Sequence, residues 1–268
     1  MGPYSRPEGA PTPAKRPVVQ RISEISPLAQ NYLLILFMMQ EESGTVTMTR
    51  LADELAISPA TEHLGTSLAS VAGMIRRMKR DGLVDILPNK EIVFTDIGLT
   101  QARDIMRRHQ LAECLLAHVL GMELHKVHAE AHRLEHGISP EVQASMAKRL
   151  GNPDRCPFGH PIPGSNYKVP EDTVGLNKVR LGTPMVVERI PEDDPRLVEY
   201  LVRNHMLPGA QVKVVDVASY RGTVTIVVEG GGEVVVGLQV APRILVHPPT
   251  SRDSDARSLV GAGTQKAR

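Results

Sequence analysis

Hydrophobic residues in the first hundred positions recur at the spacing of amphipathic helices. Dense apolar positions follow Ser26-Pro27, a typical helix start, and Leu51 and Leu55 continue helical spacing in a second segment. A third segment follows Thr66 or Ser67, either of which can cap a helix. The pattern predicts three helices, at residues 26–40, 49–55 and 68–80.

The period then changes to that of β-strands. Short apolar runs at residues 84–87 and 92–94 flank the turn Pro88-Asn89-Lys90, which predicts a hairpin. Three helices followed by a hairpin is the order of a winged helix-turn-helix, whose third helix enters the major groove of DNA. We therefore expect a DNA-binding domain of this type at residues 24–98.

Amphipathic helical spacing returns after the hairpin. It extends over residues 99–120 and 127–138, and Ser139-Pro140-Glu141 is the start signal of a further helix. The aliphatic faces of these segments are sufficient for helix packing or for a dimer interface. The pattern predicts a helical domain at residues 99–163.

The last third of the chain changes to β-structure. Glycine and proline dominate residues 157–173, which predicts a linker, and we place it at residues 164–176. Short β-branched runs follow, around a helical insertion at residues 196–204. They predict a small β-barrel at residues 177–248 and hence an α+β fold class. The runs are residues 186–187, 212–217, 223–228 and 233–236.

Composition adds limits on the environment and the partners. The net charge is only +1, so binding to nucleic acid would depend on a local basic patch. Two cysteines give no disulfide framework, which favours a reducing compartment. No window approaches the roughly 20 apolar residues of a membrane span, and no signal peptide is evident. We expect a cytoplasmic protein without a membrane partner, with disordered tails at residues 1–23 and 249–268.

A local basic patch is present in the third predicted helix. Its arginines would contact phosphates, whereas small polar residues near its start could approach base edges. A basic run of this kind is as often a solvated surface, but its position before a predicted wing favours DNA. The predicted DNA-contacting residues are Ser67, Ser70, Arg76, Arg77, Arg80 and Lys90.

Histidine and glutamate recur at helical spacing in the helical domain. Steps of four, three and one residues put His128, His132, Glu135 and His136 on one helix face. His109 and Glu113 repeat the four-residue step in another segment. A solvated helix face is the simpler alternative for any one of them. Together they favour a site for a divalent transition metal, because imidazole with carboxylate suits iron, manganese, cobalt, nickel or zinc.

Two alternatives to regulated DNA binding remain open from these residues. Residues 132–136 form H-x-x-E-H, the inverted zinc-peptidase signature, in which the glutamate is the general base. The motif is short, and nothing around it is typical of a peptidase, so we expect no enzyme. The second alternative is a DNA-binding protein whose metal is purely structural.

Four longer strings identify a family resemblance. They are R-D-G-L-V at residues 80–84, R-R-H-Q-L-A-E at 107–113, H-K-V-H-A-E-A-H-R-L-E-H at 125–136 and C-P-F-G-H-P-I-P-G at 156–164. On these strings the chain resembles the DtxR/MntR family of metal-dependent transcriptional repressors over residues 26–248. The resemblance implies a C-terminal SH3-like (FeoA-like) domain and a homodimer. It also implies binding to a palindromic double-stranded DNA operator when Fe²⁺ or Mn²⁺ is present, with repression of metal-uptake genes.

The resemblance also divides the metal-binding candidates into two sites. An ancillary site is implied at His109, Glu113 and His128, completed by Glu188 or Glu192. A primary, regulatory site is implied at His132, Glu135 and His136, with Asn31 from the first helix. Family members have Cys or Glu at position 132 and Met or Asp at position 31. This chain has His132 and Asn31 instead, so the bound metal could be Zn²⁺, Co²⁺ or Ni²⁺ as well as Fe²⁺ or Mn²⁺.

The region before the recognition helix also departs from the family pattern. Additional residues lie somewhere in Pro59 to Ser67, and Gly73 replaces the usual polar residue of that helix. The operator sequence therefore does not follow from the resemblance.

Overall fold

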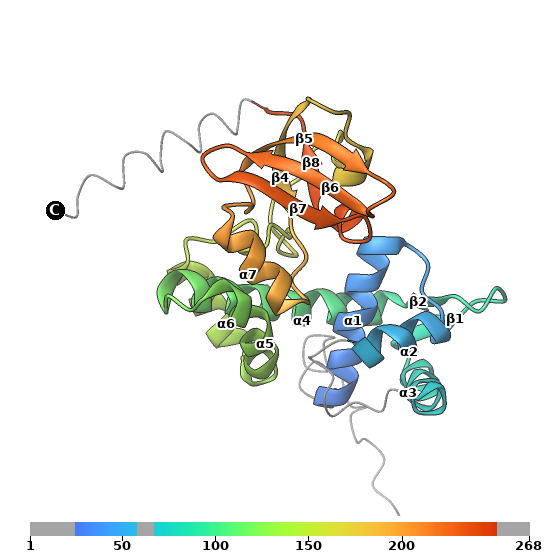
Figure 1. Cartoon of the computed structure of the whole chain (residues 1–268). Coiled ribbons are helices and arrows are strands. Elements are labelled where there is room, and N and C mark those ends of the chain that lie inside the picture. Colours follow the sequence, from blue (N-terminus) through green and yellow to red (C-terminus); the bar gives the residue numbers. More distant parts are fainter. Residues whose placement is uncertain (1–24, 58–66, 251–268) are drawn as a thin grey trace, which may run out of the picture.

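A computed structural model describes residues 25–57 and 67–250 of the chain. The predicted tail at residues 1–23, residues 251–268 of the tail predicted at 249–268, and the predicted insertion before Ser67 lie outside these described residues. The described part forms three regions (Figure 1). One long helix runs from the first region into the second, and the sheet of the third lies above them in this view. We call them the N-terminal, helical and C-terminal domains.

The N-terminal domain has the predicted order of helices and hairpin. Its elements are α1 (Pro27–Ser43), α2 (Met48–Ile57), α3 (Leu68–Arg80), β1 (Val84–Ile86) and β2 (Ile92–Phe94). The Ser26 side chain caps α1 by accepting a hydrogen bond from the Ala29 amide, and Ser67 caps α3 in the same way. The winged helix-turn-helix prediction is confirmed.

Helix α1 lies at the centre of this domain. Leu33 and Leu36 are fully buried and share one aliphatic core with Ile75 of α3. Ile105, from the long helix of the next domain, belongs to the same core. Helix α1 thus packs against α3 within its own domain and against the long helix of the helical domain. A metal ion that linked α1 to the helical domain would therefore affect the position of α3.

The helical domain contains α4 (Asp96–Cys114), α5 (Leu124–Leu134) and α6 (Pro140–Arg149). The predicted single helix at residues 99–120 is interrupted, because α4 continues into a π-helical segment at Leu115–Val119. The predicted helix at residues 127–138 likewise ends in a 3₁₀ turn at Glu135–Gly137. Both irregular segments adjoin the histidine and glutamate residues.

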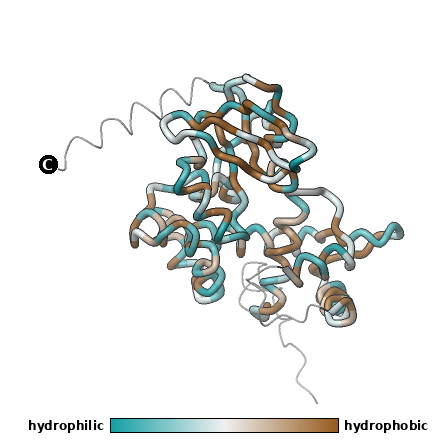
Figure 2. Tube along the Cα trace, viewed as in Figure 1, coloured by the Kyte–Doolittle hydropathy of each residue, from teal (hydrophilic) through white to brown (hydrophobic). Residues whose placement is uncertain are grey.

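The C-terminal domain is a six-stranded antiparallel sheet in the order β3-β8-β4-β5-β6-β7. Its strands are β3 (Val174–Gly175), β4 (Pro184–Arg189), β5 (Gln211–Ala218), β6 (Thr223–Val228), β7 (Gly232–Gly237) and β8 (Leu245–His247). Helix α7 (Pro195–Arg203) corresponds to the predicted helical insertion. The strands are predominantly hydrophobic, and the core is aliphatic (Figure 2). Strands β3 and β8 were not predicted, since two or three residues show no period.

Part of the segment predicted as a linker is packed rather than free. Phe158 and Ile162 are buried in the core that joins the helical and C-terminal domains. Gly159 has φ +97°, and a Cβ there would lie 2.1 Å from the Glu188 carbonyl oxygen, so the turn requires glycine. This loop fixes β4 against the helical domain.

No helix among the described residues is long and apolar enough to cross a membrane.

Candidate metal centre

Helix α4 positions two fully buried side chains one turn apart. His109 Nε2 lies 3.0 Å from Glu113 Oε1, and His109 Nδ1 lies 2.7 Å from Glu135 Oε2. The His109 ring therefore lies between two carboxylates from different segments. Buried polar groups arranged in this way stiffen a site and fix the orientation of each ring.

Helix α5 adds a second pair of imidazoles, also one turn apart. His128 Nδ1 lies 3.1 Å from Glu113 Oε1 and 3.2 Å from His109 Nε2. Glu192, which follows β4, approaches to 3.8 Å from His128 Nδ1. One ligand atom from each of His109, Glu113, His128 and Glu192 lies within 4.8 Å of the others, and all four residues are buried. The structure thus brings together the four residues expected at the ancillary site.

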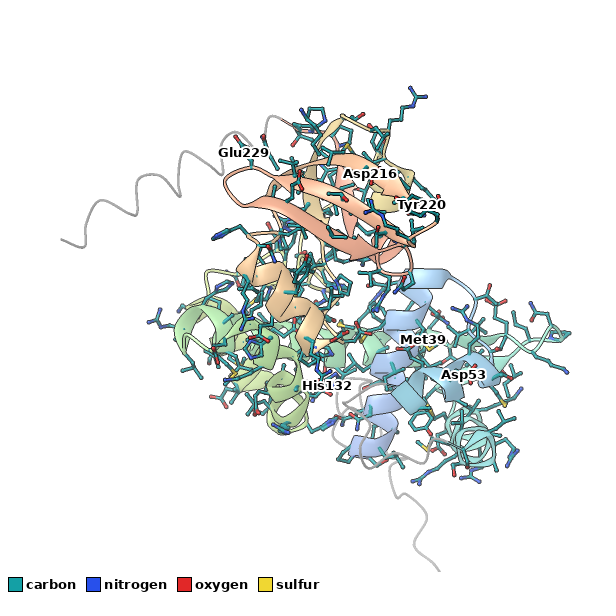
Figure 3. The ribbon with its side chains drawn as sticks, viewed as in Figure 1. Met39, Asp53, His132, Asp216, Tyr220 and Glu229 are labelled. Carbon is teal, nitrogen blue, oxygen red and sulfur yellow. The ribbon has the colours of Figure 1, made fainter. Side chains whose placement is uncertain are left out.

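The second expected set converges next to the first. Asn31 Oδ1 of α1 lies 2.8 Å from His136 Nε2. Glu135 Oε1 lies 3.5 Å from both His132 Nδ1 and His136 Nε2. His132 and His136 therefore lie beside one carboxylate oxygen, and Asn31 of α1 contacts the His136 ring. Figure 3 labels His132 in this part of the molecule.

The two carboxylates proposed from the C-terminal domain have different surroundings. Glu188 accepts a 2.8 Å hydrogen bond from the Tyr167 hydroxyl and one of 3.2 Å from Arg155. Its charge is thereby compensated away from the histidine cluster. The structure brings Glu192, and not Glu188, to the ancillary site.

Several buried polar atoms in this cluster have no hydrogen-bond partner among the described residues. They are Glu113 Oε2, Glu135 Oε1, Glu192 Oε2 and His160 Nε2. A buried carboxylate oxygen without a partner costs on the order of 1–3 kcal/mol. Since all three carboxylates face imidazoles, a divalent cation is a chemically fitting counterpart. The donor set fits a transition metal.

Burial sets the protonation of the imidazoles. It lowers the pKa of His128 to about 4 and also lowers the pKa of His132 and His136. Burial acts in the same direction on His109, but the charge of Glu113 and hydrogen bonds to Glu113 and Glu135 raise its pKa well above the usual value. A metal ion would therefore compete with a proton on His109, while the other rings offer free lone pairs.

Two residues near these sites were not predicted from the sequence. Gln30 Oε1 lies 2.9 Å from His136 Nδ1, opposite the Asn31 contact. His160 Nε2 lies 3.5 Å from Glu192 Oε2. His160 belongs to the C-P-F-G-H-P-I-P-G string, which was a signal for it, whereas a single glutamine in an apolar helix gives none.

The predicted DNA-contacting residues lie on the exposed side of the N-terminal domain. Val71, Met74, Ile75 and Met78 form the buried face of α3. The opposite face is exposed and carries Ser67, Ser70, Arg76, Arg77 and Arg80, and Lys90 is exposed in the hairpin turn. Arg77 and Arg80 lie 3.7 and 3.9 Å from the Asp81 carboxylate, contacts that are exposed and weak. These side chains are accessible to a phosphate backbone.

A winged helix-turn-helix joined to a buried histidine and glutamate cluster defines the class of metal-responsive DNA-binding regulators. Three family models match the chain in series. They are the N-terminal DNA binding domain of the iron dependent repressor at residues 24–92, its metal binding and dimerisation domain at 95–164, and the FeoA domain at 174–248.

Individual relatives agree with these models. The iron-dependent repressor IdeR of Mycobacterium leprae is 32% identical over 243 residues, which cover 84% of this chain and 99% of the relative. The diphtheria toxin repressor of Corynebacterium diphtheriae is 39% identical over 133 residues, 50% of this chain and 55% of the relative. A solved manganese-dependent transcriptional repressor in complex with manganese is 30% identical, with a TM-score of 0.72, covering 82% of this chain and all of that one.

The chain belongs to the iron-dependent repressor family, whose members include the diphtheria toxin repressor and IdeR. These relatives are transcriptional repressors and not enzymes, so the peptidase alternative for residues 132–136 has no support. In the structure Glu135 Oε2 is also engaged by His109, which does not suit a general base facing a metal-bound water.

Proposed function

We infer that this protein is a repressor that binds a palindromic DNA operator as a homodimer when Fe²⁺ or Mn²⁺ is bound, and controls metal-uptake genes. The observation that carries the proposal is the contact between Asn31 of α1 and His136. It joins the helix at the centre of the DNA-binding domain to the metal cluster across 105 residues of sequence.

The proposed regulatory ligands are Asn31, His132, Glu135 and His136. A divalent cation there supplies a cross-link between α1 and the end of α5. Asn31 and Gln30 both contact the His136 ring, so α1 is fixed in tilt as well as in distance. Since α1 and α3 share one core, the spacing of the two recognition helices in a dimer depends on this cross-link.

The proposed ancillary ligands are His109, Glu113, His128 and Glu192. Glu192 belongs to the C-terminal domain, and the other three to α4 and α5. A second cation there would hold the C-terminal domain against the helical domain. Carboxylates from both domains give this site the harder ligand set preferred by Fe²⁺ and Mn²⁺.

On the DNA side, we propose that Ser67 and Ser70 approach base edges at the start of α3. The arginines Arg76, Arg77 and Arg80, with Lys90 on the wing, would contact phosphates. Two copies of this helix related by a twofold axis require an operator with two inverted half-sites. This geometry is the reason for expecting a palindrome.

The test is operator selection from random DNA with Fe²⁺, with Mn²⁺ and without metal, followed by binding measurements on the selected site. We expect binding that needs metal in the wild type and is lost in His136→Ala. His125→Ala, a substitution on α5 outside both proposed sites, is the matched control. Metal-independent binding of equal strength would overturn the gating.

A purely structural metal gives a different result in the same experiment. In that case, chelation would unfold the protein instead of only weakening operator binding. Thermal melting in the presence of a chelator separates the two outcomes.

A further inference from the structure

The imidazole of His132 has different neighbours at its two nitrogens. Nδ1 faces Glu135 Oε1 at 3.5 Å, on the side of the proposed regulatory site. Nε2 points the other way and lies 3.2 Å from His128 Nε2. The ring centroids of His132 and His109 are only 4.5 Å apart. His132 therefore belongs as much to the His109 and His128 pair as to the regulatory ligands.

The three imidazoles have the spacing of metal ligands. One nitrogen from each of His109, His128 and His132 lies within 4.8 Å of the other two. His109 Nε2 and His128 Nδ1 are 3.2 Å apart, as are the Nε2 atoms of His128 and His132. Two nitrogens bound to a tetrahedral zinc ion at ~2.0–2.1 Å are separated by about 3.3–3.4 Å. Each of the two contacts is close to this separation. Because they use opposite nitrogens of His128, one ion would bind only one of those nitrogens, and the three ligand atoms then lie within 4.8 Å of one another.

Glu135 orients two of the three rings for this role. Its Oε2 accepts a 2.7 Å hydrogen bond from His109 Nδ1–H, and its Oε1 faces His132 Nδ1. With a proton held on Nδ1, Nε2 is the atom of each ring that can bind a metal ion, which on His109 would first displace a second proton. A carboxylate behind a histidine is the usual support of a metal-bound imidazole.

We propose that His109, His128 and His132 form a three-imidazole site for Zn²⁺, Co²⁺ or Ni²⁺, an alternative ligand set that overlaps the two sites proposed above. The inference rests on the proposed function because the sites share residues. Neutral nitrogen ligands without a carboxylate favour these ions over Mn²⁺, which prefers oxygen ligands. An ion at the three-imidazole site takes His109 and His128 from the carboxylate-containing ancillary set. The two classes of ion therefore compete, and His132 is the residue that determines the choice.

The test uses one variant that affects only the three-imidazole set and one that affects only the ancillary set. Both are made in a His136→Ala background, which removes the regulatory site. His132→Asn retains a polar atom near the position of Nδ1 but removes Nε2. Glu113→Gln with Glu192→Gln removes both carboxylates of the ancillary set. Affinities for Zn²⁺ and for Mn²⁺, each added alone, are measured by competition with a metal-binding dye.

We expect His132→Asn to weaken Zn²⁺ binding at least about tenfold and to change Mn²⁺ binding less than about twofold. The double glutamine variant should show the reverse pattern. If Zn²⁺ affinity falls with the glutamates and not with His132, zinc occupies the ancillary set and the inference is overturned. His125→Asn, the same substitution on the same helix, should change neither affinity, and melting in chelator checks that each variant folds.

Bound Co²⁺ gives a second measurement of the same ligands. Four-coordinate Co²⁺ with three imidazoles absorbs strongly in the visible, and this absorption should be lost in His132→Asn and retained in the double glutamine variant. An unchanged spectrum in His132→Asn would contradict the site. Mn²⁺-dependent operator binding of the wild type is measured separately, so that the proposed function can stand if this inference fails.

Discussion

The residues of the metal cluster illustrate what spacing along a helix can and cannot predict. The four-residue steps from His109 to Glu113 and from His128 to His132 indicate which side chains share a face. They give no information on Gln30 and Asn31, which contact His136 from more than a hundred residues away. Resemblance to a known family identified Asn31, but only the folded structure reveals Gln30 beside it.

Buried imidazoles make the stability of the metal-free protein depend on pH. Burial lowers the folded-state pKa of His128 to about 4 and that of His160 to about 3. The unfolded chain therefore binds more protons between pH ~6.5 and these values, and the free energy of unfolding falls as pH falls through this window. Each such group contributes about 1.4 kcal/mol per pH unit at most.

His109 acts with the opposite sign, because its folded-state pKa is raised. Its contribution is present below pH ~6.5 and is lost as pH rises through the raised value. Glu192 acts in the same direction as His109, because burial raises its pKa well above the usual value. These two raised groups oppose four lowered imidazoles, so we expect a net loss of stability on acidification. Urea denaturation in chelator at pH 7.5, 6 and 5 measures it. His160→Asn should flatten the profile, and the exposed His118→Asn should not.

Glu188 and Glu192 offer a matched pair of substitutions at this scale. Glu192 lies beside His128, whereas Glu188 is engaged by Tyr167 and Arg155. Glu192→Gln should therefore remove or weaken one Mn²⁺ equivalent at least about tenfold, while Glu188→Gln leaves metal stoichiometry unchanged. Isothermal titration of both variants decides. If only Glu188→Gln lost a Mn²⁺ equivalent, the ligand would be Glu188 and the proposed role of Glu192 would be wrong.

At the scale of elements, periodicity predicted long segments better than short ones. Helix α3 has the predicted bounds, 68–80, because four buried residues repeat at helical spacing between a serine cap and a glycine-containing turn. Strands β3 and β8 are too short to show alternation and depend on pairing with each other and with β4. The π-helical end of α4 was also missed, because its residues remain compatible with an ordinary helix.

The exposed face of α3 leads to a prediction about salt dependence. Arg76 is exposed, and a phosphate contact there would release about one counterion on binding. Arg76→Ala should weaken operator binding and reduce the slope of log K against log salt by ~0.9. Arg196→Ala, an exposed arginine on α7, is the control. An unchanged slope in Arg76→Ala would exclude this phosphate contact.

At the scale of the whole molecule, all three domains contribute to one buried cluster. Asn31 comes from the N-terminal domain, His109 and His128 from the helical domain, and Glu192 from the C-terminal domain. The domain order was predictable because each domain has its own period and turn signals. The way the three domains pack around one cluster was not predictable from the sequence. The loop around Phe158, which joins two of them, has the composition of a linker although it is packed into the core.

This convergence predicts which parts of the chain respond to metal. The aliphatic cores of the domains contain no metal ligand, so chelation should leave most amides of β5, β6 and α3 as protected as before. Amides of α1 near Asn31 and of the segment around Glu192 should exchange faster, because their cross-links to α4 and α5 are lost. Hydrogen exchange measured by mass spectrometry with Mn²⁺ and with chelator tests this. Uniformly faster exchange across all three domains would instead indicate a metal required for folding, and the gating of α1 by His136 would lose its basis.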